Sequence, residues 1–247
     1  MNEKRSSYKY YSQRMKKIRE FKKSIKVGSK CAKCGETDIK LLDFSHYSRK
    51  DKSVDLRIPH SIAKLKEELT KGRFLCVWCH RLETAEEYKN IVEKNNKEYF
   101  RYTKEALDLA IDANAKMCGG PLCKRTMRHS SLFYQDKNGK LSNHCKKCKS
   151  VYSRIGRLRA KNYVTRIKLE TGQCQECKIP VTEKTICCFD YDHLDMKTKT
   201  HTISRMTCGG RRNDSIQKEI DKCRLLCCKC HRIYTWSQLN QVDYELL

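Results

Sequence analysis

Hydrophobic and polar positions along the chain predict short elements. Two basic stretches of helical character, residues 11–28 and 152–172, each begin at a Tyr-Ser pair and reach a Gly, where a helix can stop. Residues 84–117 mix Glu, Lys, Ala and Leu without Gly or Pro, which predicts a helix broken once or twice. A short strand is predicted at 133–134, before an Asp-Lys-Asn-Gly turn, and a strand followed by a turn is predicted within residues 188–195. Together these elements predict a small α+β fold.

One motif occurs twice and indicates an internal repeat. Leu-Cys-x-x-Cys-His-Arg stands at residues 75–81 and at 226–232, each time after a basic stretch and an earlier Cys-x-x-Cys pair. Such self-similarity predicts two copies of one supersecondary unit. Between the copies, residues 118–148 place a strand and a turn between two further Cys pairs, which is typical of a zinc ribbon or knuckle. The role of this middle unit is either purely structural or part of binding.

The cysteines predict zinc in preference to disulfides. The polar N-terminus shows no signal peptide, so we expect an intracellular, reducing compartment: cytoplasm, nucleus or virion. Twelve of the 17 cysteines form six close pairs, enough for three structural Zn²⁺ sites. A redox-active Cys-x-x-Cys is the alternative, but the chain lacks a thioredoxin-like pattern. The predicted ligands are Cys31, Cys34, Cys76 and Cys79; Cys118, Cys123, Cys145 and Cys148; and Cys174, Cys177, Cys227 and Cys230.

The charge predicts a polyanionic partner. The net charge is +25, and with 38% hydrophobic and 34% charged residues the chain is too polar for one large core. Residues 1–30 hold eleven Lys and Arg, residues 146–168 hold nine and no acid, and no apolar run is long enough to span a membrane. We expect nucleic acid, with double-stranded DNA favoured over RNA; a merely solvated face is the alternative. The expected phosphate contacts are Arg154, Arg157, Arg159, Lys161, Arg211 and Arg212.

The second copy contains a candidate hydrolytic site. Asp192 and His193 lie in the predicted strand and turn, and His231 directly follows the last cysteine of the third set. A zinc ion that fixes His231 relative to this strand would bring a carboxylate and two imidazoles together. Asp192 and His231 would then hold a hard divalent cation, Mg²⁺ or Mn²⁺, and His193 would take a proton from the attacking water. The alternatives for His231 are a zinc ligand or part of a c-type haem motif.

The segments CQEC, FDYDHLD and LLCCKCHR resemble the HNH, or treble-clef ββα-metal, endonucleases. The closest likeness is to the zinc-containing branch, which includes phage recombination endonucleases and HNH proteins of large DNA viruses. It covers residues 150–240 well and 10–85 more loosely. The resemblance implies that Asp192 and His231 bind the catalytic metal, that His193 is the general base and that the four surrounding cysteines are structural.

Both copies depart from the HNH pattern. Lys222 and Lys71 stand where many HNH proteins have an Asn that helps to orient the base. In the first copy His46 matches the general base, but Ser45 stands at the place of the aspartate, unless Asp43 substitutes for it. We therefore expect the first copy to be impaired or inactive in catalysis and to bind DNA.

These expectations combine into one architecture: a small zinc-stapled α+β protein with two treble-clef HNH-like units flanking a zinc ribbon, joined by basic helices. The predicted function is a metal-dependent DNA endonuclease that nicks DNA through the second copy. The alternative is a catalytically inactive zinc-containing nucleic-acid-binding protein with a packaging, virion or transcription-associated role. The expected segments are a basic helical arm at 1–30, a degenerate clef at 31–85, a helical connector at 86–117, the ribbon at 118–148, a basic helix at 149–173 and the more complete clef at 174–247.

Overall fold

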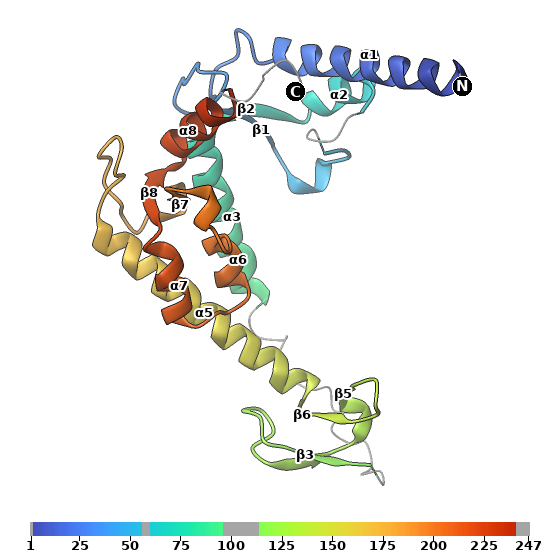
Figure 1. The fold of residues 1–247 in the computed structure, drawn as a ribbon, viewed down its shortest axis with the longest axis vertical. Helices are drawn as coiled ribbons and strands as arrows, with labels where there is room; N and C mark the ends of the chain where they lie inside the picture. The colour runs from blue at the N-terminus through green and yellow to red at the C-terminus, as the bar shows by residue number, and fades with distance from the viewer. Residues whose placement is uncertain (1, 56–59, 96–113, 241–247) are drawn as a thin grey trace. The chain divides into compact units, whose positions relative to one another are not determined.

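The computed structural model describes residues 2–55, 60–95 and 114–240 (Figure 1). The chain divides into two compact units. Unit 1 comprises residues 1–86, 187–190 and 226–247, and unit 2 comprises residues 87–186 and 191–225. Most of the expected connector, residues 96–113, lies outside the described residues. In the part of the chain that is described, no helix combines the length and the apolar character needed to cross a membrane.

Unit 1 is built around a two-stranded antiparallel sheet from the first copy. The strands β1 and β2 pair with Leu42 opposite Cys76 and Phe44 opposite Phe74. The helix α3 begins directly after β2, and the last helix, α8, belongs to the same unit. The elements of unit 1 are α1 (Asn2–Ser24), β1 (Leu42–His46), a 3-10 turn (Arg49–Asp51), α2 (Ile62–Leu69), β2 (Gly72–Cys76), α3 (Val77–Asn95) and α8 (Cys228–Asn240).

The core of the first copy is small and rich in sulphur. Leu42 and Leu75 are fully buried, and they pack with Cys31, Cys76 and Cys79. Leu42 and Phe44 of β1 lie opposite Cys76 and Phe74 of β2 on one face of the hairpin, whereas Leu75 lies opposite Asp43 on the other face. So little apolar area is enclosed here that the cysteines form much of the core, as expected for a unit that a metal stabilises.

Unit 2 contains the middle cysteine unit, a long basic helix and most of the second copy. Its strands form the two-stranded sheets β3–β4 and β5–β6, and β7 pairs with β8. The elements wholly in unit 2 are β3 (Lys116–Cys118), β4 (Thr126–Arg128), β5 (Phe133–Gln135), β6 (Leu141–Cys145), α5 (Lys146–Thr171), α6 (Ile203–Cys208) and α7 (Asn213–Ile220), with 3-10 turns at Ser130–Leu132 and Met196–Thr198. The strands β7 (Phe189–His193) and β8 (Cys223–Cys227) and the 3-10 turn Ile186–Cys188 are divided between the units, and residues 187–190 and 226–227 belong to unit 1.

The helix α5 anchors the two short helices of the second copy. Ala160 and Val164, one helical turn apart, are buried and form a core with residues of α6 and α7. The helix stops where the sequence predicts, because Gly172 takes the left-handed conformation (φ +77°) and donates its N–H to Lys168 O at 3.2 Å. The remaining core residues are Ile203, Met206, Ile216 and Ile220.

The middle unit holds more structure than the sequence predicts. The expected hairpin is present as β5 and β6, and Asp136 Oδ1 accepts hydrogen bonds from the turn amides of Asn138 and Lys140, each at 2.9 Å. A second hairpin, β3–β4, reverses the chain at Lys124 and Arg125, both in the left-handed region. The connector expected to be helical up to residue 117 therefore ends in a strand, because residues 116–118 pair across this turn.

The two copies share one local backbone conformation. In each copy the amide of the first cysteine donates a hydrogen bond to the carbonyl five residues later. The backbone amide of the residue after the first strand's histidine donates to the backbone carbonyl of the lysine just before the second strand. The matching bonds are Cys31 N to Glu36 O (2.8 Å) and Cys174 N to Ile179 O (2.9 Å), then Tyr47 N to Lys71 O and Leu194 N to Lys222 O (both 3.0 Å).

Candidate metal centres and surrounding polar sites

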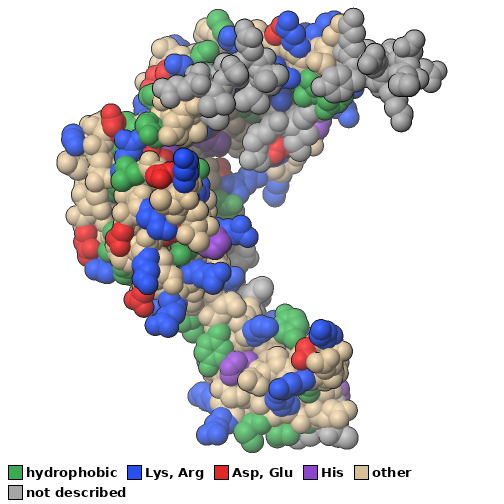
Figure 2. All heavy atoms as spheres, viewed as in Figure 1, with side chains coloured by type: hydrophobic (Ala, Val, Ile, Leu, Met, Phe, Trp, Pro, Cys, Tyr) green, Lys and Arg blue, Asp and Glu red, His purple; other side chains and the backbone are tan. Residues whose placement is uncertain are grey.

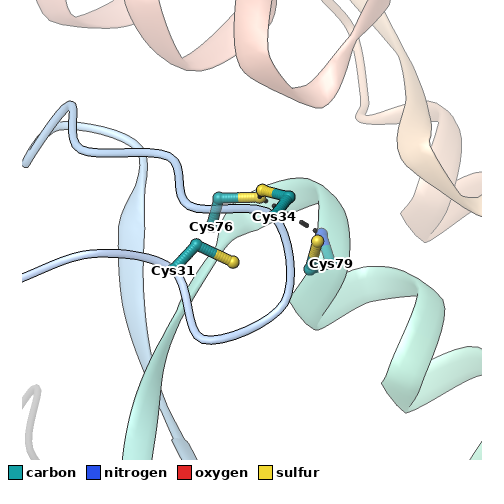
Figure 3. A group of neighbouring side chains, drawn as sticks. All are labelled: Cys31, Cys34, Cys76 and Cys79. Atoms are coloured by element: carbon teal, nitrogen blue, oxygen red, sulfur yellow. Dashed lines mark hydrogen bonds between the residues drawn. The ribbon is translucent and has the colours of Figure 1, made fainter.

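Three sets of four cysteines could each hold a metal ion, and they are the three sets that the spacing predicts. In each set the four Sγ atoms lie within 4.8 Å of one another, and none of the 17 cysteines forms a disulfide. Figure 3 shows Cys31 and Cys34 on a loop converging with Cys76, at the end of β2, and Cys79, in the first turn of α3. Cys34 Sγ lies 3.6 Å from Cys76 Sγ. A tetrahedral Zn²⁺ with bonds of about 2.3 Å separates its sulphurs by roughly 3.8 Å, so the spacing is consistent with zinc.

A helix begins at the second cysteine pair of every set. The helices α3, α5 and α8 start inside these pairs, and in each pair the amide of the second cysteine donates to the sulphur of the first at 3.4 Å. Amide donors and the positive end of a helix favour the thiolate form that binds metal. Burial, however, raises the pKa of Cys148 to about 12. A metal ion entering this set would therefore displace protons.

A histidine–glutamate pair occurs in both copies, with the glutamate buried in each and the histidine buried in the second. His193 Nε2 lies 2.9 Å from Glu219 Oε1, and His46 Nε2 lies 2.7 Å from Glu68 Oε1. His193 is 4% exposed, and the two glutamates are 3% and 1% exposed. The residue expected to be the general base is thus enclosed and directed at a buried carboxylate.

Each buried glutamate also accepts hydrogen bonds from a lysine three residues later and from two backbone amides. These bonds tie a loop and a helix to the strand that carries the histidine. Glu219 accepts from Lys222 Nζ (2.8 Å), Thr200 N (2.7 Å) and His201 N (3.1 Å). Glu68 accepts from Lys71 Nζ (3.2 Å), Ser53 N (2.9 Å) and Val54 N (3.2 Å). Lys222 and Lys71 are the residues at the expected Asn place, so their contacts here are with a glutamate.

These donors keep both glutamates ionised. Burial alone would raise the pKa of Glu68, but hydrogen bonds from His46, the two amides and Lys71 outweigh it and lower the pKa to about 2. Burial likewise acts to raise the pKa of Glu219, and its donors hold that pKa far below the usual range. The two copies therefore share a buried, charged and hydrogen-bonded network.

Asp192 contacts an arginine from the neighbouring strand. It is 8% exposed, and Arg224 Nε donates to its Oδ2 at 3.2 Å. In the first copy Ser45 lies 3.5 Å from Glu83 Oε1, and Arg73 donates to Glu83 Oε2 at 2.9 Å. Each copy thus places an arginine of its second strand in contact with a carboxylate, next to the residue that precedes the histidine of its first strand. In the first copy the carboxylate comes from α3, because the strand provides only a serine.

His231 contacts Asp190, which lies two residues before Asp192 in β7. Its Nδ1 lies 3.4 Å from Asp190 Oδ2, and Arg81 of α3 places Nη2 2.6 Å from the same oxygen. The first copy has the matching arrangement around Asp43. His80 Nδ1 lies 3.8 Å from Asp43 Oδ2, and Arg232 of α8 donates to both carboxylate oxygens of Asp43 at 2.8 and 2.9 Å. We call these two contacts, Arg81–Asp190 and Arg232–Asp43, the reciprocal clasp.

The three residues predicted to be catalytic therefore have three different neighbours. In the described residues, the groups of three or more His, Cys, Asp and Glu side chains close enough to share an ion are the three cysteine sets. The catalytic assignment stays a prediction. The neighbours are Glu219 for His193, Arg224 for Asp192 and Asp190 for His231.

Sequence reasoning missed the glutamates and the arginines of the clasp. The signal was present, because Glu68 and Glu219 each stand three residues before the lysine that the two copies share. Arg81 and Arg232 also stand in both copies of the repeated motif. A repeat compared position by position would have singled out all four residues.

Some of the predicted phosphate contacts come together where α5 meets the loop before α7. Arg159 donates to the carbonyls of Gly210 and Arg211, at 3.3 Å each. Gly210 is in the left-handed region (φ +64°), and a Cβ there would lie 3.0 Å from Arg157 N, so only glycine allows this approach. Arg157, Arg159 and Arg211 are exposed, and Figure 2 shows Lys and Arg side chains on the face where Figure 1 places α5 and α7.

The other predicted phosphate contacts vary in exposure. Arg212 is in the same loop; its side chain is 82% exposed and lies 3.4 Å from Asp214. Lys161 is exposed on α5, whereas Arg154 is half-buried. We name Arg157, Arg159, Arg211 and Arg212 the arginine cluster. Their assignment to nucleic acid stays a prediction.

Comparisons with protein-family models, with curated proteins and with solved structures found no significant match for this chain.

Proposed function

We propose that the protein is a zinc-stapled nucleic-acid-binding protein in which the histidines of both copies have a structural role. One observation carries this proposal: the His–Glu pair has nearly the same geometry in the copy with Ser45 and in the copy with Asp192. A general base has to reach a water molecule, whereas His193 is 4% exposed and faces Glu219. An arrangement common to both copies, including the one that lacks the metal-binding aspartate, supports a role in folding.

The arginine cluster is the proposed contact with nucleic acid, and double-stranded DNA is the proposed partner. The net charge of +25 favours any polyanion. Arg157, Arg159 and Arg211 hold their charges on a rigid helix and an adjoining loop, and guanidinium groups pair well with phosphate oxygens. Such contacts give affinity that depends on salt and only weakly on sequence.

Salt-dependent binding of a labelled duplex tests this proposal. In fluorescence anisotropy, Arg211→Ala with Arg212→Ala should weaken binding and reduce the slope of log K against log salt by roughly 1 per arginine removed. Lys137→Ala with Lys184→Ala removes two exposed charges elsewhere and should leave both quantities nearly unchanged. Equal effects of the two double variants would mean that the cluster has no special role. No binding by the wild type at low salt would reject the proposal.

The second candidate function is the metal-dependent endonuclease. The Asp190–His231 contact favours it, because a carboxylate and an imidazole at 3.4 Å are oxygen and nitrogen donors of the kind that Mg²⁺ or Mn²⁺ accepts. In this function Asp192 would join His231 as a metal ligand, and His193 would turn from Glu219 to a water molecule. The metal would stabilise the charge that develops on the phosphate.

A plasmid-nicking assay separates the two functions. The wild type is incubated with supercoiled plasmid and Mg²⁺ or Mn²⁺, beside His193→Ala and His231→Ala. Under the binding proposal no variant and no metal gives nicking above background, while the wild type retains salt-sensitive binding. Nicking by the wild type that both substitutions abolish would establish the endonuclease and overturn the structural role of His193.

A further inference from the structure

Unit 1 contains a pocket of about 360 Å³ whose lining includes two lysines, two arginines and a histidine. Among the described residues, those that line the pocket include no Asp or Glu. The side chains come from the segment after α1, the loop before β1, the start of α3 and the first turns of α8. The lining residues are Lys26, Lys40, Val77, Arg81, Cys228, His231, Arg232, Thr235 and Trp236.

Contacts behind the pocket hold several of its charges in place. Lys26 Nζ donates to Leu42 O at 2.8 Å, and Arg81 and Arg232 are the two arginines of the reciprocal clasp. Within the described part of the chain, Asp43 and Asp190 therefore offset part of the charge of the two lysines and two arginines that line the pocket. Burial lowers the pKa of Lys26; Asp43 acts to raise it and Arg232 to lower it further. An anion in the pocket would relieve this crowding of like charges.

An aromatic ring lies beside these cations. Trp236 lines the pocket, and Lys40 Nζ lies 5.6 Å from the centroid of its ring. Aromatic rings next to basic side chains are the elements with which proteins bind single nucleotides: the ring stacks on the base and the cations contact the phosphate. The apolar part of the lining, Val77 and Cys228, gives the pocket a second surface that a base can contact.

We propose that this pocket binds a nucleotide, with the phosphate between Lys26, Lys40 and the clasp arginines and the base against Trp236. The proposal does not depend on the arginine cluster, which belongs to unit 2. A free nucleotide and the terminal nucleotide of a single strand share this chemistry. The pocket therefore recognises a phosphate joined to an aromatic base, and the experiment distinguishes the two sources.

Tryptophan fluorescence tests the proposal, because the chain has only two tryptophans. Trp78→Phe keeps an aromatic ring against Phe189 and leaves Trp236 as the single reporter. Adenosine monophosphate should quench Trp236 saturably, and adenosine without phosphate should bind at least about tenfold more weakly. A single-stranded oligonucleotide with a 5′ phosphate, compared with the same strand lacking it, shows whether a strand end enters the pocket. Calorimetry on the unsubstituted chain repeats the comparison without the Phe variant.

The matched variants are Lys40→Ala for the pocket and Lys30→Ala as the control, both exposed lysines of the first copy. Lys40→Ala should weaken binding of adenosine monophosphate about tenfold or more, and Lys30→Ala should change it less than twofold. Equal binding by the two variants, or equal binding of adenosine and its monophosphate, would overturn the proposal. The proposal would also be overturned if no probe quenched the tryptophan fluorescence and none gave a heat of binding in calorimetry. Duplex binding through the arginine cluster should persist in Lys40→Ala, so failure of one proposal is distinguishable from failure of the other.

Discussion

At the residue scale, Glu219 connects several parts of the second copy. A buried carboxylate loses its hydration, and Glu219 replaces it with hydrogen bonds from His193, Lys222 and two backbone amides. Lys222 also donates to Thr198 O at 3.0 Å. The network therefore holds the loop after β7 against α7, and the first copy repeats it around Glu68.

Removing the charge of Glu219 should destabilise the zinc-loaded protein. Glu219→Gln keeps the shape of the side chain but leaves His193 and Lys222 without a carboxylate, so we expect a loss of about 2–4 kcal/mol in the free energy of unfolding. The measurement is urea unfolding followed by circular dichroism. Glu183→Gln, an exposed residue, is the control and should cost less than about 0.5 kcal/mol. An equally small effect at Glu219 would contradict the network.

Glu68 should make stability depend on pH in a defined direction. Its pKa is lowered to about 2 in the folded protein, against about 4.3 in an unfolded chain. A depressed pKa contributes stability that is present above pH 4.3 and is lost as the pH falls towards 2. The difference in unfolding free energy between wild type and Glu68→Gln should thus be constant from pH 7 to 5 and shrink below pH 4.3. If the difference between wild type and Glu68→Gln instead grows as the pH falls, the predicted direction of the pH dependence is wrong.

Among single residues, the cysteine sets were predicted from their spacing, whereas the repeat marks the positions of the two glutamates but not their burial. Cysteines that come in close pairs, five of them Cys-x-x-Cys and one the wider Cys118/Cys123, restrict which ligands can meet, and the spacing predicted the three sets that lie together. The partner of His193 is 26 residues away, and a glutamate in a polar helix gives no sign that it will be buried. His193 and Asp192 were placed correctly in a strand, but their neighbours depend on tertiary packing.

At the element scale, the reciprocal clasp joins α3 and α8 to the strands of the opposite copy within unit 1. Arg232 at the start of α8 holds Asp43 of β1 with two hydrogen bonds. Arg81 at the start of α3 holds Asp190 of β7. Both helices begin at a cysteine pair, so a metal ion that fixes the first turn also fixes the arginine.

Replacing Arg232 by lysine should not be conservative. Lysine cannot form the two parallel hydrogen bonds to Asp43, so Arg232→Lys should lower the free energy of unfolding by about 1–3 kcal/mol. Arg212→Lys is the matched control, because its side chain is 82% exposed and its contact with Asp214 is long. A double-mutant cycle with Asp43→Asn measures the coupling. Coupling near zero would show that the contact does not stabilise unit 1.

Elements with strong local signals were predicted well. α5 ends beside its glycine, and the β5–β6 hairpin forms at an Asp-Lys-Asn-Gly turn. The β3–β4 hairpin was missed because its turn residues, Lys124 and Arg125, are not typical of the left-handed region. Its strands are only three residues long and lack an alternating pattern. Their pairing follows from the first cysteine pair of the ribbon, a constraint that local propensity does not contain.

At the scale of the whole molecule, metal content should decide whether the chain folds. We expect three zinc ions per chain by elemental analysis, and two after Cys123→Ser. Structural zinc contributes on the order of 10–16 kcal/mol of apparent binding free energy, more than such polar units can replace. A strong chelator should therefore abolish most of the helical circular dichroism signal, and added zinc should restore it. An unchanged spectrum after verified metal removal would reject the role of the metal.

The reciprocal clasp has a consequence for how the two copies can change. In a symmetric homodimer every substitution appears on both sides, so an altered residue must suit both partners at once. Here both halves of the contact lie on one chain, and each can be altered alone. Ser45 and Asp192, which lie outside the clasp, are a difference of this kind between the copies: the second copy has its carboxylate on the strand, and the first takes it from Glu83 of α3. Because the two copies are parts of one chain, the residues of one copy can change while the other copy keeps the common structure.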